Sequence, residues 1–252
     1  MDLQDFVEDN WTKAAENYSS NIQKELNSFK KSVWTDIIME NAPEKKKLDI
    51  LDAGTGPGFF AIILSLAGHR VTAVDCTEKM IEEAKKNALE SKVNPEFHVM
   101  DSHALNFEDE SFDLIVSRNV TWTLRDAETA YKEWKRVLHP GGKILIFDAN
   151  WNLNLFDEKY RLKFERDEEE YEKYIEKYGK SPNHNGHPDN GDEFRRSMPM
   201  NRRLRPQWDF NVLLKLGFTK IYCETDIFEK VWDEYEKLKY KSRPMFMISV
   251  EK

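Results

Sequence analysis

The sequence predicts a doubly wound α/β fold, in which a mostly parallel sheet carries helices on both faces. Short apolar runs alternate with amphipathic segments between residues 48 and 148, a pattern typical of βα repeats. The first apolar run ends in an acid and a glycine-rich turn, as strands often do before a helix in such folds. The 252 residues suit one large domain with insertions better than two complete domains.

Residues 1–45 are expected to form an N-terminal helical cap. Apolar side chains recur there at intervals of three to four residues, among them Trp11, Tyr18, Ile22 and Trp34. A lysine run follows and leads into the first expected strand.

Residues 46–150 are expected to form the core of the sheet. The expected strands are 48–52, 70–75, 96–101, 112–117 and 143–148. The expected helices are 59–66, 77–90 and 126–138. Asp126 can cap the start of the last helix, and the proline and glycines after His139 favour a turn at its end.

Residues 151–206 interrupt this alternation and are predicted to form a helical lid. A charged segment with aromatic residues at helical spacing predicts a helix over 157–178. Residues 181–191 are rich in turn-forming types, so we expect an exposed loop that orders when ligands bind. Residues 207–252 return to the core, with a helix at 207–216 and two closing strands at 219–227 and 245–250, which makes a seven-stranded sheet.

Composition limits the classes of function. The formal net charge of -8 and the pI of about 5.4 disfavour nucleic acid as a partner. Cys76 and Cys223 are far apart and suggest neither a disulfide framework nor a metal site. No apolar run reaches the ~18 residues of a membrane span, and the N-terminal residues do not resemble a signal peptide. We therefore expect a cytoplasmic monomer or homodimer that does not bind membranes.

The strongest chemical signal is the turn that runs from Asp52 through Gly54, Gly56 and Gly58. Glycines at such a turn let a ligand approach the backbone, and this device serves nucleoside triphosphates, dinucleotides and S-adenosylmethionine. A triphosphate site needs a lysine and a hydroxyl residue after the loop, where this chain has two phenylalanines. A dinucleotide site needs its third glycine one residue later.

With this loop, the later acids and the Leu138-His139-Pro140-Gly141-Gly142 turn, the chain resembles class I S-adenosylmethionine-dependent methyltransferases. The similarity is to the small-molecule branch that includes ubiquinone- and biotin-pathway enzymes. It covers roughly residues 48–150, and the segment from Arg205-Pro206-Gln207-Trp208 onward is consistent with the last strands of that family. The resemblance implies a Rossmann-like sheet and S-adenosylmethionine as cofactor, with S-adenosylhomocysteine as product.

The resemblance also implies roles for individual residues. The three glycines would pass under the methionine part of the cofactor, with Asp52 beneath its ammonium group. Asp75 would accept hydrogen bonds from the ribose hydroxyls, and Asp101 from the adenine amino group. Further cofactor contacts are expected from Tyr18, Cys76, Met80, Ser102, Ser117, Arg118 and Asn119. For Tyr18 and Met80, an ordinary place in the apolar core is an open alternative.

The implied reaction needs little acid or base catalysis, because the sulfonium of the cofactor is already an activated leaving group. If a general base is used, the candidates are His103, His184 and His187, although a plain surface histidine is the favoured interpretation of each. The segment after the fourth strand lacks the Asn/Asp-Pro-Pro-aromatic motif of adenine N-methylation and the cysteine of cytosine C5 methylation.

We therefore expect a small-molecule acceptor, which the arginines of the lid could hold if it is anionic. The candidate acceptor residues are Trp11, Trp122, Trp151, Arg202 and Arg205. The alternatives are an RNA or protein methyltransferase and a non-catalytic regulatory module that binds S-adenosylmethionine.

Overall fold

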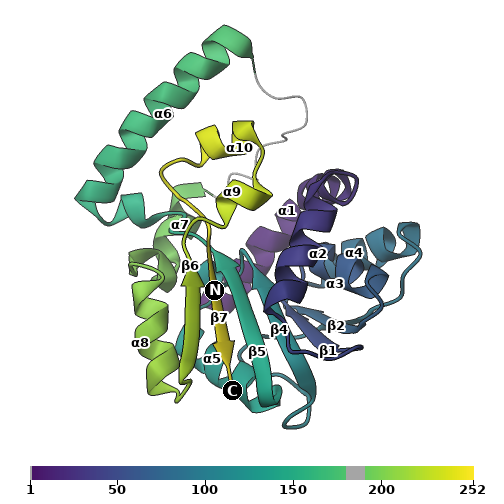
Figure 1. Cartoon of the computed structure of the whole chain (residues 1–252). Helices are drawn as coiled ribbons and strands as arrows, with labels where there is room; N and C mark the ends of the chain where they lie inside the picture. The colour runs from purple at the N-terminus through teal and green to yellow at the C-terminus, as the bar shows by residue number, and fades with distance from the viewer. Residues whose placement is uncertain (1, 180–190) are drawn as a thin grey trace.

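The computed structural model describes residues 2–179 and 191–252. Its centre is a seven-stranded sheet in the order β3-β2-β1-β4-β5-β7-β6 (Figure 1). The strands are β1 (Asp49–Ala53), β2 (Arg70–Asp75), β3 (Glu96–Val99), β4 (Phe112–Arg118), β5 (Leu138–Asp148), β6 (Lys220–Glu224) and β7 (Phe246–Glu251). Strands β1 to β5 pair in parallel, and β7 is antiparallel to both of its neighbours. The predicted α/β class and seven-stranded sheet are confirmed.

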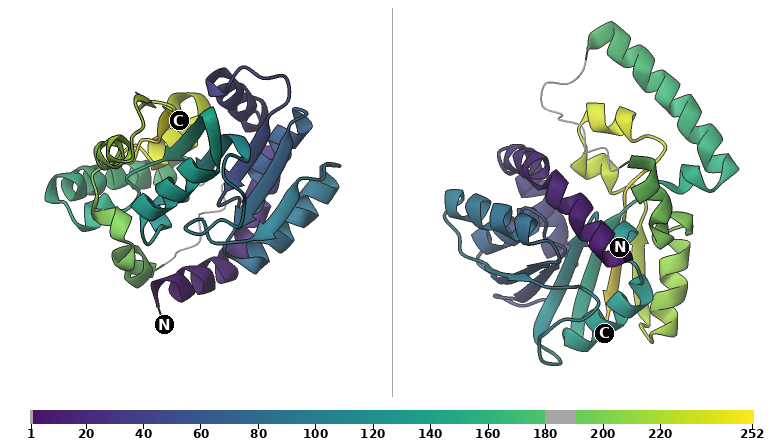
Figure 2. Two further views of the ribbon diagram at one scale, coloured as in Figure 1. Left: turned by 90° about the horizontal axis from the view of Figure 1, so that it is seen from below. Right: turned by 180° about the vertical axis from the view of Figure 1, so that it is seen from behind.

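Helices cover both faces of this sheet (Figures 1 and 2). They are α1 (Leu3–Leu26), α2 (Lys30–Asn41), α3 (Phe59–Leu66), α4 (Glu78–Glu90), α5 (Ala127–Val137), α6 (Glu158–Tyr178), α7 (Gly191–Ser197), α8 (Gln207–Lys215), α9 (Phe228–Val231) and α10 (Glu234–Lys239). Three 3-10 turns join them: η1 (Thr121–Thr123), η2 (Leu153–Leu155) and η3 (Pro199–Arg202).

Two apolar cores form because successive strand residues point to opposite faces. In β1, Ile50 faces the core that contains α2 and α3, whereas Leu51 faces the core that contains α5 and α8. Both side chains are fully buried. A sheet buried on both faces needs continuous apolar strands, and the apolar runs of the sequence supply them.

The strand order changes direction between β1 and β4, because the chain leaves β3 at one edge and returns beside β1. In open α/β sheets, ligands bind at the carboxyl ends of the strands at such a switch point. The loops after β1 and β4 therefore mark where a functional site is expected.

Several boundaries differ from those predicted. The expected turn at His139 to Gly142 is the start of β5, because Gly141 N–H donates to the carbonyl of Lys252 and Lys252 N–H donates to Gly142. The strand expected at 219–227 ends at Glu224, and the short helices α9 and α10 follow it.

The insertion between β5 and α8 is closed at its base by one pair of residues. The Asn150 side chain donates to the carbonyl of Arg205 at 2.7 Å and accepts from Arg205 N–H at 3.0 Å. From this base α6 extends away from the sheet and lies beside α10 (Figures 1 and 2), where the hydroxyls of Tyr171 and Tyr235 are hydrogen-bonded. Most of the predicted loop at 181–191, with His184 and His187, lies outside the described residues.

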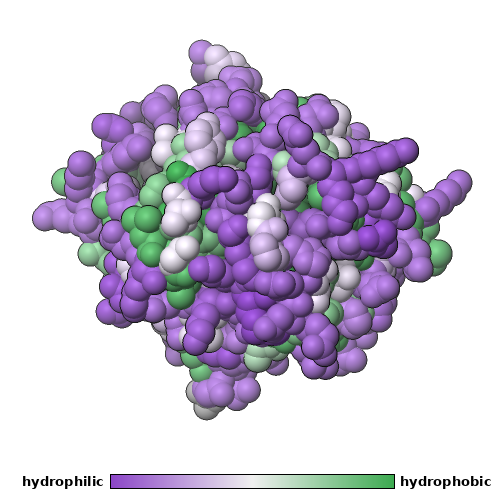
Figure 3. Space-filling view, turned by 60° about the horizontal axis from the view of Figure 1, so that its bottom comes forward, coloured by the Kyte–Doolittle hydropathy of each residue, from purple (hydrophilic) through white to green (hydrophobic). Residues whose placement is uncertain are grey.

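The face seen in Figure 3 is mostly hydrophilic, and its apolar residues lie in small separate groups. Among the helices formed by residues 2–179 and 191–252, none has the length and apolar character that crossing a bilayer requires.

Candidate functional site

A cavity of about 90 Å³ lies at the switch point of the sheet. The loops after β1, β2, β3 and β4 line it, and α1 closes it from above. Most of the expected cofactor residues meet here: Tyr18, Asp52, Gly54, Gly56, Asp75, Cys76, Met80, Asp101, Ser102, Arg118 and Asn119. We call this space the cofactor cavity.

Asp52 is a buried acid at the end of β1. One of its oxygens, Oδ2, accepts from the Thr55 hydroxyl at 2.6 Å and from Ala61 N–H at 3.0 Å, which fixes the side chain at the start of α3. Burial raises the pKa of Asp52 to about 6, although these hydrogen bonds favour the ionised form. A cationic group in the cavity would restore the preference for the carboxylate.

Asp75 ends β2 and holds the glycine loop. Its Oδ2 accepts from Gly56 N–H at 2.9 Å, and its Oδ1 accepts from Thr77 N–H at 2.9 Å. Burial raises the pKa of Asp75 above its ordinary value. Each carboxylate oxygen can accept more than one hydrogen bond, so Asp75 can still accept from a ligand in the cavity.

The glycines of the loop have distinct roles. Gly54 has φ +77, and a Cβ there would lie 2.4 Å from the Val120 side chain, so the loop and the segment after β4 touch only because the side chain is absent. Gly58 has φ +92, starts α3 and faces Ala84 of α4 at 3.1 Å. Gly58 does not line the cavity as the structure has it, and it lets α3 approach α4, so its place under the cofactor stays a prediction.

Asp101 lies beyond the end of β3 in an ion-pair cluster. Its Oδ1 is bonded to His103 Nδ1 at 2.6 Å, and its Oδ2 accepts from Arg125 at 2.5 Å. Burial opposes ionisation of Asp101, but these bonds outweigh it and hold the pKa of Asp101 well below its ordinary value. His103 Nε2 accepts from Asp126 N–H at 3.3 Å, so both ring nitrogens are engaged. Neither ring nitrogen of His103 is left without a hydrogen-bond partner, which weakens its case as a general base and suits it to orienting Asp101.

Four aromatic rings form the cover of the cofactor cavity. Trp11 makes edge contacts with Tyr18, Trp122 and Phe194, with centroid separations of 5.8, 6.2 and 6.3 Å. Trp11 and Tyr18 line the cavity directly, whereas Trp122 supports them from behind and donates from Nε1 to the carbonyl of Asn119. Phe194 belongs to α7, so the insertion helps to close the cofactor cavity.

Residues at the carboxyl end of β4 differ in whether their side chains reach the cofactor cavity. Ser117 is fully buried, and its hydroxyl donates to the carbonyl of Ala53 at 2.9 Å, so its side chain joins β4 to β1 and does not line the cavity; its cofactor contact stays a prediction. Arg118 lines the cavity and stacks on Phe59 at 4.4 Å. Cys76 also lines it, and burial raises the pKa of its thiol to about 12, so the thiol stays protonated.

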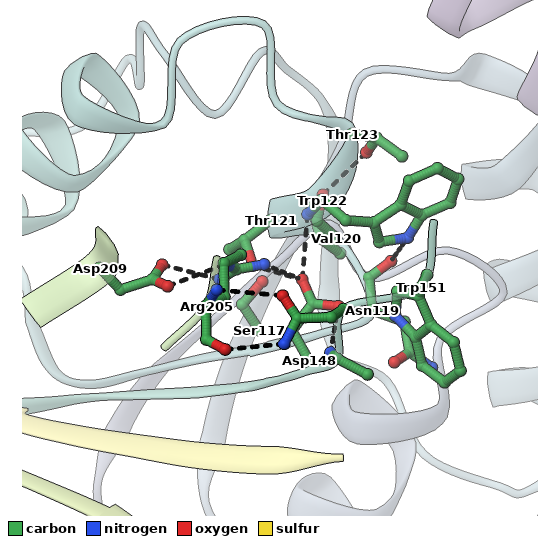
Figure 4. Close-up of polar contacts among 12 residues, drawn as sticks. Ser117, Asn119, Val120, Thr121, Trp122, Thr123, Asp148, Trp151, Arg205 and Asp209 are labelled. Atoms are coloured by element: carbon green, nitrogen blue, oxygen red, sulfur yellow. Dashed lines mark hydrogen bonds and ion pairs between the residues drawn. The ribbon is translucent and has the colours of Figure 1, made fainter. Parts of the chain in front are cut away.

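Arg205 is the centre of a fully buried network beneath the site (Figure 4). It donates to Asp148 and Asp209, each at 2.8 Å, and to the hydroxyl of Thr121 at 2.7 Å. Its side chain is 1% exposed and both carboxylates are 0% exposed. The expectation that Arg205 holds an anionic substrate is wrong, because its charge is already neutralised inside the protein.

Through Asp148, the same network holds Trp122 and Trp151 in place. Asp148 accepts from the Thr121 hydroxyl, from Trp122 N–H at 3.0 Å and from Trp151 Nε1 at 2.7 Å (Figure 4). Arg202 lies 4.7 Å from the ring centroid of Phe156 and lines neither the cofactor cavity nor its neighbour described next, so neither cavity supports its predicted substrate role.

A second cavity of about 440 Å³ adjoins the first. Both are lined by Tyr18, Ile22, Arg118 and Asn119. We call the second one the side chamber. Its other walls come from the α1–α2 connection, from Trp151 and from residues 231–245. Sequence reasoning found Trp151 but missed Glu25, Lys30, Trp232, Glu236 and Tyr240, because nothing in their local pattern distinguishes them from ordinary helix residues.

The residues of the cofactor cavity fit the polar groups of S-adenosylmethionine. Asp52 is a buried and Asp75 a partly buried hydrogen-bond acceptor, which suit an ammonium group and two hydroxyls. Gly56 has no atom within 4 Å of the place where a Cβ would stand, so a ligand can approach the backbone there. The cavity is smaller than the roughly 300 Å³ at which small-molecule sites begin, so the aromatic cover must move when it fills.

Comparison with known proteins agrees with this geometry. Residues 51–146 match a family described as "Methyltransferase domain". The chain is 36% identical over 109 residues to a malonyl-[acyl-carrier protein] O-methyltransferase of Erwinia pyrifoliae, covering 43% of this chain and 40% of the relative. It is 32% identical over 136 residues to a demethylmenaquinone methyltransferase of Staphylococcus aureus, covering 52% and 56%.

Among solved structures, a candidate S-adenosyl-L-methionine-dependent methyltransferase of Methanococcus maripaludis superposes with a TM-score of 0.60. It shares 24% identity, and the match covers 96% of this chain and 93% of that one. The chain spans about half the length of the curated relatives it matches, so these similarities establish the fold and the domain.

Proposed function

The chain belongs to the class I S-adenosylmethionine-dependent methyltransferases by its fold and by the domain at residues 51–146, and on that premise we propose that it methylates a small-molecule acceptor. One observation carries the proposal: acids from consecutive strand ends, Asp52 and Asp75, meet the glycine loop in a single cavity. The side chamber next to that cavity has the size of a small-molecule site.

When bound, S-adenosylmethionine would supply an activated methyl group, and the proton that the acceptor loses would pass to bulk solvent after the product leaves the site. The protein's own residues bind and orient. Asp52 would hold the ammonium group and Asp75 the ribose hydroxyls, while Met80 packs beside the nucleoside. The rings of Trp11 and Tyr18 would exclude water from the site.

The proposal is tested by titrating S-adenosylhomocysteine into the protein in a calorimeter. We expect binding, and we expect Asp75→Asn to weaken it by at least about 10-fold, because a charged acceptor of hydrogen bonds is lost. Asp113→Asn is the matched control: Asp113 accepts from Asp49 N–H at the amino end of β4 and lines no part of the cofactor cavity.

If calorimetry detects binding of neither S-adenosylmethionine nor S-adenosylhomocysteine, the proposal is refuted. Binding without any formation of S-adenosylhomocysteine across a panel of small aromatic alcohols and amines would favour the non-catalytic module instead.

A further inference from the structure

The side chamber has an aromatic wall. Trp232 and Tyr240 stand 5.3 Å apart between ring centroids, and Trp151 lies 5.7 Å from Tyr240. Trp34 adds a fourth ring on the α2 side. The polar end of Trp151 is already bonded to Asp148, so its carbon face is what remains for a ligand. Rings of this kind favour a flat, apolar guest.

The charged groups of the side chamber neutralise one another. The lining contains three basic and three acidic residues: Lys24, Lys30, Arg118, Glu25, Asp233 and Glu236. Lys30 bridges Glu236 at 2.6 Å and Glu25 at 3.3 Å, and Glu25 also accepts from Arg118 at 2.8 Å. These four paired groups offer a charged guest no free counter-ion, and the lining as a whole has as many basic as acidic residues, so the side chamber favours a neutral molecule.

Asn119, a residue that lines both cavities, carries a buried hydrogen-bond acceptor without a partner among the described residues. The Asn119 side chain is hydrogen-bonded to the hydroxyl of Tyr18, yet its Oδ1 has no partner among the described residues and is shielded from solvent. The Asn119 amide N–H is therefore the donor to Tyr18. A buried carbonyl oxygen without a donor is costly, and a ligand hydroxyl or amino hydrogen would satisfy it.

Asn119 has a backbone conformation that holds this oxygen in place. Its φ is +59, in the left-handed region that asparagine tolerates better than most residues. Its N–H donates to the carbonyl of Phe147, and its own carbonyl accepts from Trp122. Asn119 and Trp151 follow the neighbouring strands β4 and β5 (Figure 4), so the amide and one ring of the aromatic wall lie at the same edge of the sheet.

We infer that the side chamber binds the methyl acceptor as a neutral aromatic molecule with a hydroxyl or amino group, whose hydrogen is donated to Asn119 Oδ1. This inference rests on the proposed function. It places the reacting oxygen or nitrogen at the boundary that the side chamber shares with the cofactor cavity. It also replaces the expectation of an anionic acceptor held by lid arginines.

Four naphthalenes with one ring system test the inference: 2-naphthol, 2-methoxynaphthalene, 2-naphthoate and 2-(aminomethyl)naphthalene. Each is titrated by calorimetry into protein saturated with S-adenosylhomocysteine. We expect 2-naphthol to bind at least about 10-fold more tightly than the anion, the cation and the methyl ether. Tighter binding of either charged compound, or equal binding of the ether, would overturn the inference.

Two variants locate the binding. Trp232→Ala should weaken 2-naphthol by about 10-fold or more and leave the affinity for S-adenosylhomocysteine unchanged, because Trp232 lines only the side chamber. Tyr222→Ala, on the exposed face of β6, is the matched control and should change neither. Asn119→Gly, which suits a positive φ, should abolish the preference for 2-naphthol over its methyl ether.

The experiments separate failure of the proposed function from failure of the inference about the acceptor. If S-adenosylhomocysteine binds but Trp232→Ala leaves 2-naphthol unaffected, only the inference about the acceptor is wrong. If S-adenosylhomocysteine does not bind, the proposed function is wrong, and the probes titrated into the protein alone then decide whether the side chamber has the stated selectivity.

Discussion

Asp52 connects the state of one proton to cofactor binding. Its pKa of about 6 means that the side chain is mostly protonated at pH 5 and mostly ionised at pH 7. The ammonium group of a ligand interacts well only with the ionised form. We therefore predict that the affinity for S-adenosylhomocysteine rises by about 10-fold as the pH rises from about 5 to about 7, and that binding at pH 6 releases protons.

Calorimetry in two buffers with different ionisation enthalpies measures those protons directly. Asp52→Asn should bind more weakly at neutral pH and lose the dependence on pH between these values. 5′-Methylthioadenosine, which lacks the amino-acid tail, is the control ligand and should show little dependence with either protein. An unchanged pH profile for Asp52→Asn would contradict the assignment of Asp52 to the ammonium group.

The sequence predicted single residues well only where local geometry determines their position. Asp52 and Asp75 end strands, so their place at the carboxyl edge follows from strand boundaries alone. Ser117 is one residue from Arg118 but points to the other side of β4, where it bonds to β1. His103 and Arg205 have the chemistry of site residues, and each has one partner close in the sequence, Asp101 and Asp209. Their other partners, Asp126 N–H and Asp148, come from distant segments, so no local pattern shows that these side chains are fully hydrogen-bonded inside the protein.

At the scale of elements, Arg205 joins α8, β5 and η1 through one buried guanidinium. Replacing it leaves Asp148 and Asp209 buried without a counter-charge. We predict that Arg205→Met lowers the free energy of unfolding by about 3–5 kcal/mol, measured by urea denaturation. Arg202→Met, at an exposed position three residues earlier, is the control and should change it by less than about 0.5 kcal/mol. Equal effects of the two would show that the network adds nothing to stability.

Helix α1 carries the rings that fill the cofactor cavity, and it must adjust when a ligand enters. Since Trp11 contacts three other rings, its surroundings change most. We predict that S-adenosylhomocysteine changes the tryptophan fluorescence of the protein and that Trp11→Phe removes most of that change. Trp208→Phe is the control, because Trp208 packs beside the α8 core and lines neither cavity. A change that survives in Trp11→Phe would mean that the cover does not move.

Element prediction was accurate for long amphipathic helices and poor for short ones. The helices α4 and α5 were predicted within one residue at each end, because capping residues and apolar spacing agree there. The helices α9 and α10 have four and six residues, which is too few to show a helical period. The apolar residues just before α9 fit a strand pattern, so the sequence extends the predicted strand to residue 227. The start of β5 depends on pairing with Lys252, which local sequence cannot show.

At the scale of the whole molecule, the side chamber could not be predicted because its walls are far apart in the sequence. Lys30 and Glu236 form an ion pair across 206 positions of the chain. The insertion was predicted to supply the acceptor pocket. In the structure it gives Trp151 to the side chamber and Phe194 to the aromatic cover, while α6 lines neither cavity.

Net charge leads to a prediction about macromolecular partners. With a formal charge of -8, the chain should repel a polyanion. We predict no binding of short single-stranded RNA in fluorescence anisotropy at about 150 mM salt, and no steep rise in affinity at lower salt. A steep salt dependence would instead support the RNA methyltransferase alternative.

The hydrogen bonds between Asn150 and Arg205 hold the first and last residues of the insertion next to each other. Because both chain ends leave the sheet at one point, 54 residues can be exchanged or shortened while the strands below keep their register. A graft that joins residues 150 and 205 by a short turn would keep every strand but lose Phe194 beside Trp11, Trp151 beside Asp148, and the buried Met198 and Met200. Exchange of this insertion would change residues beside the acceptor and leave the strands that carry Asp52 and Asp75 unaltered, so the same sheet could serve different substrates.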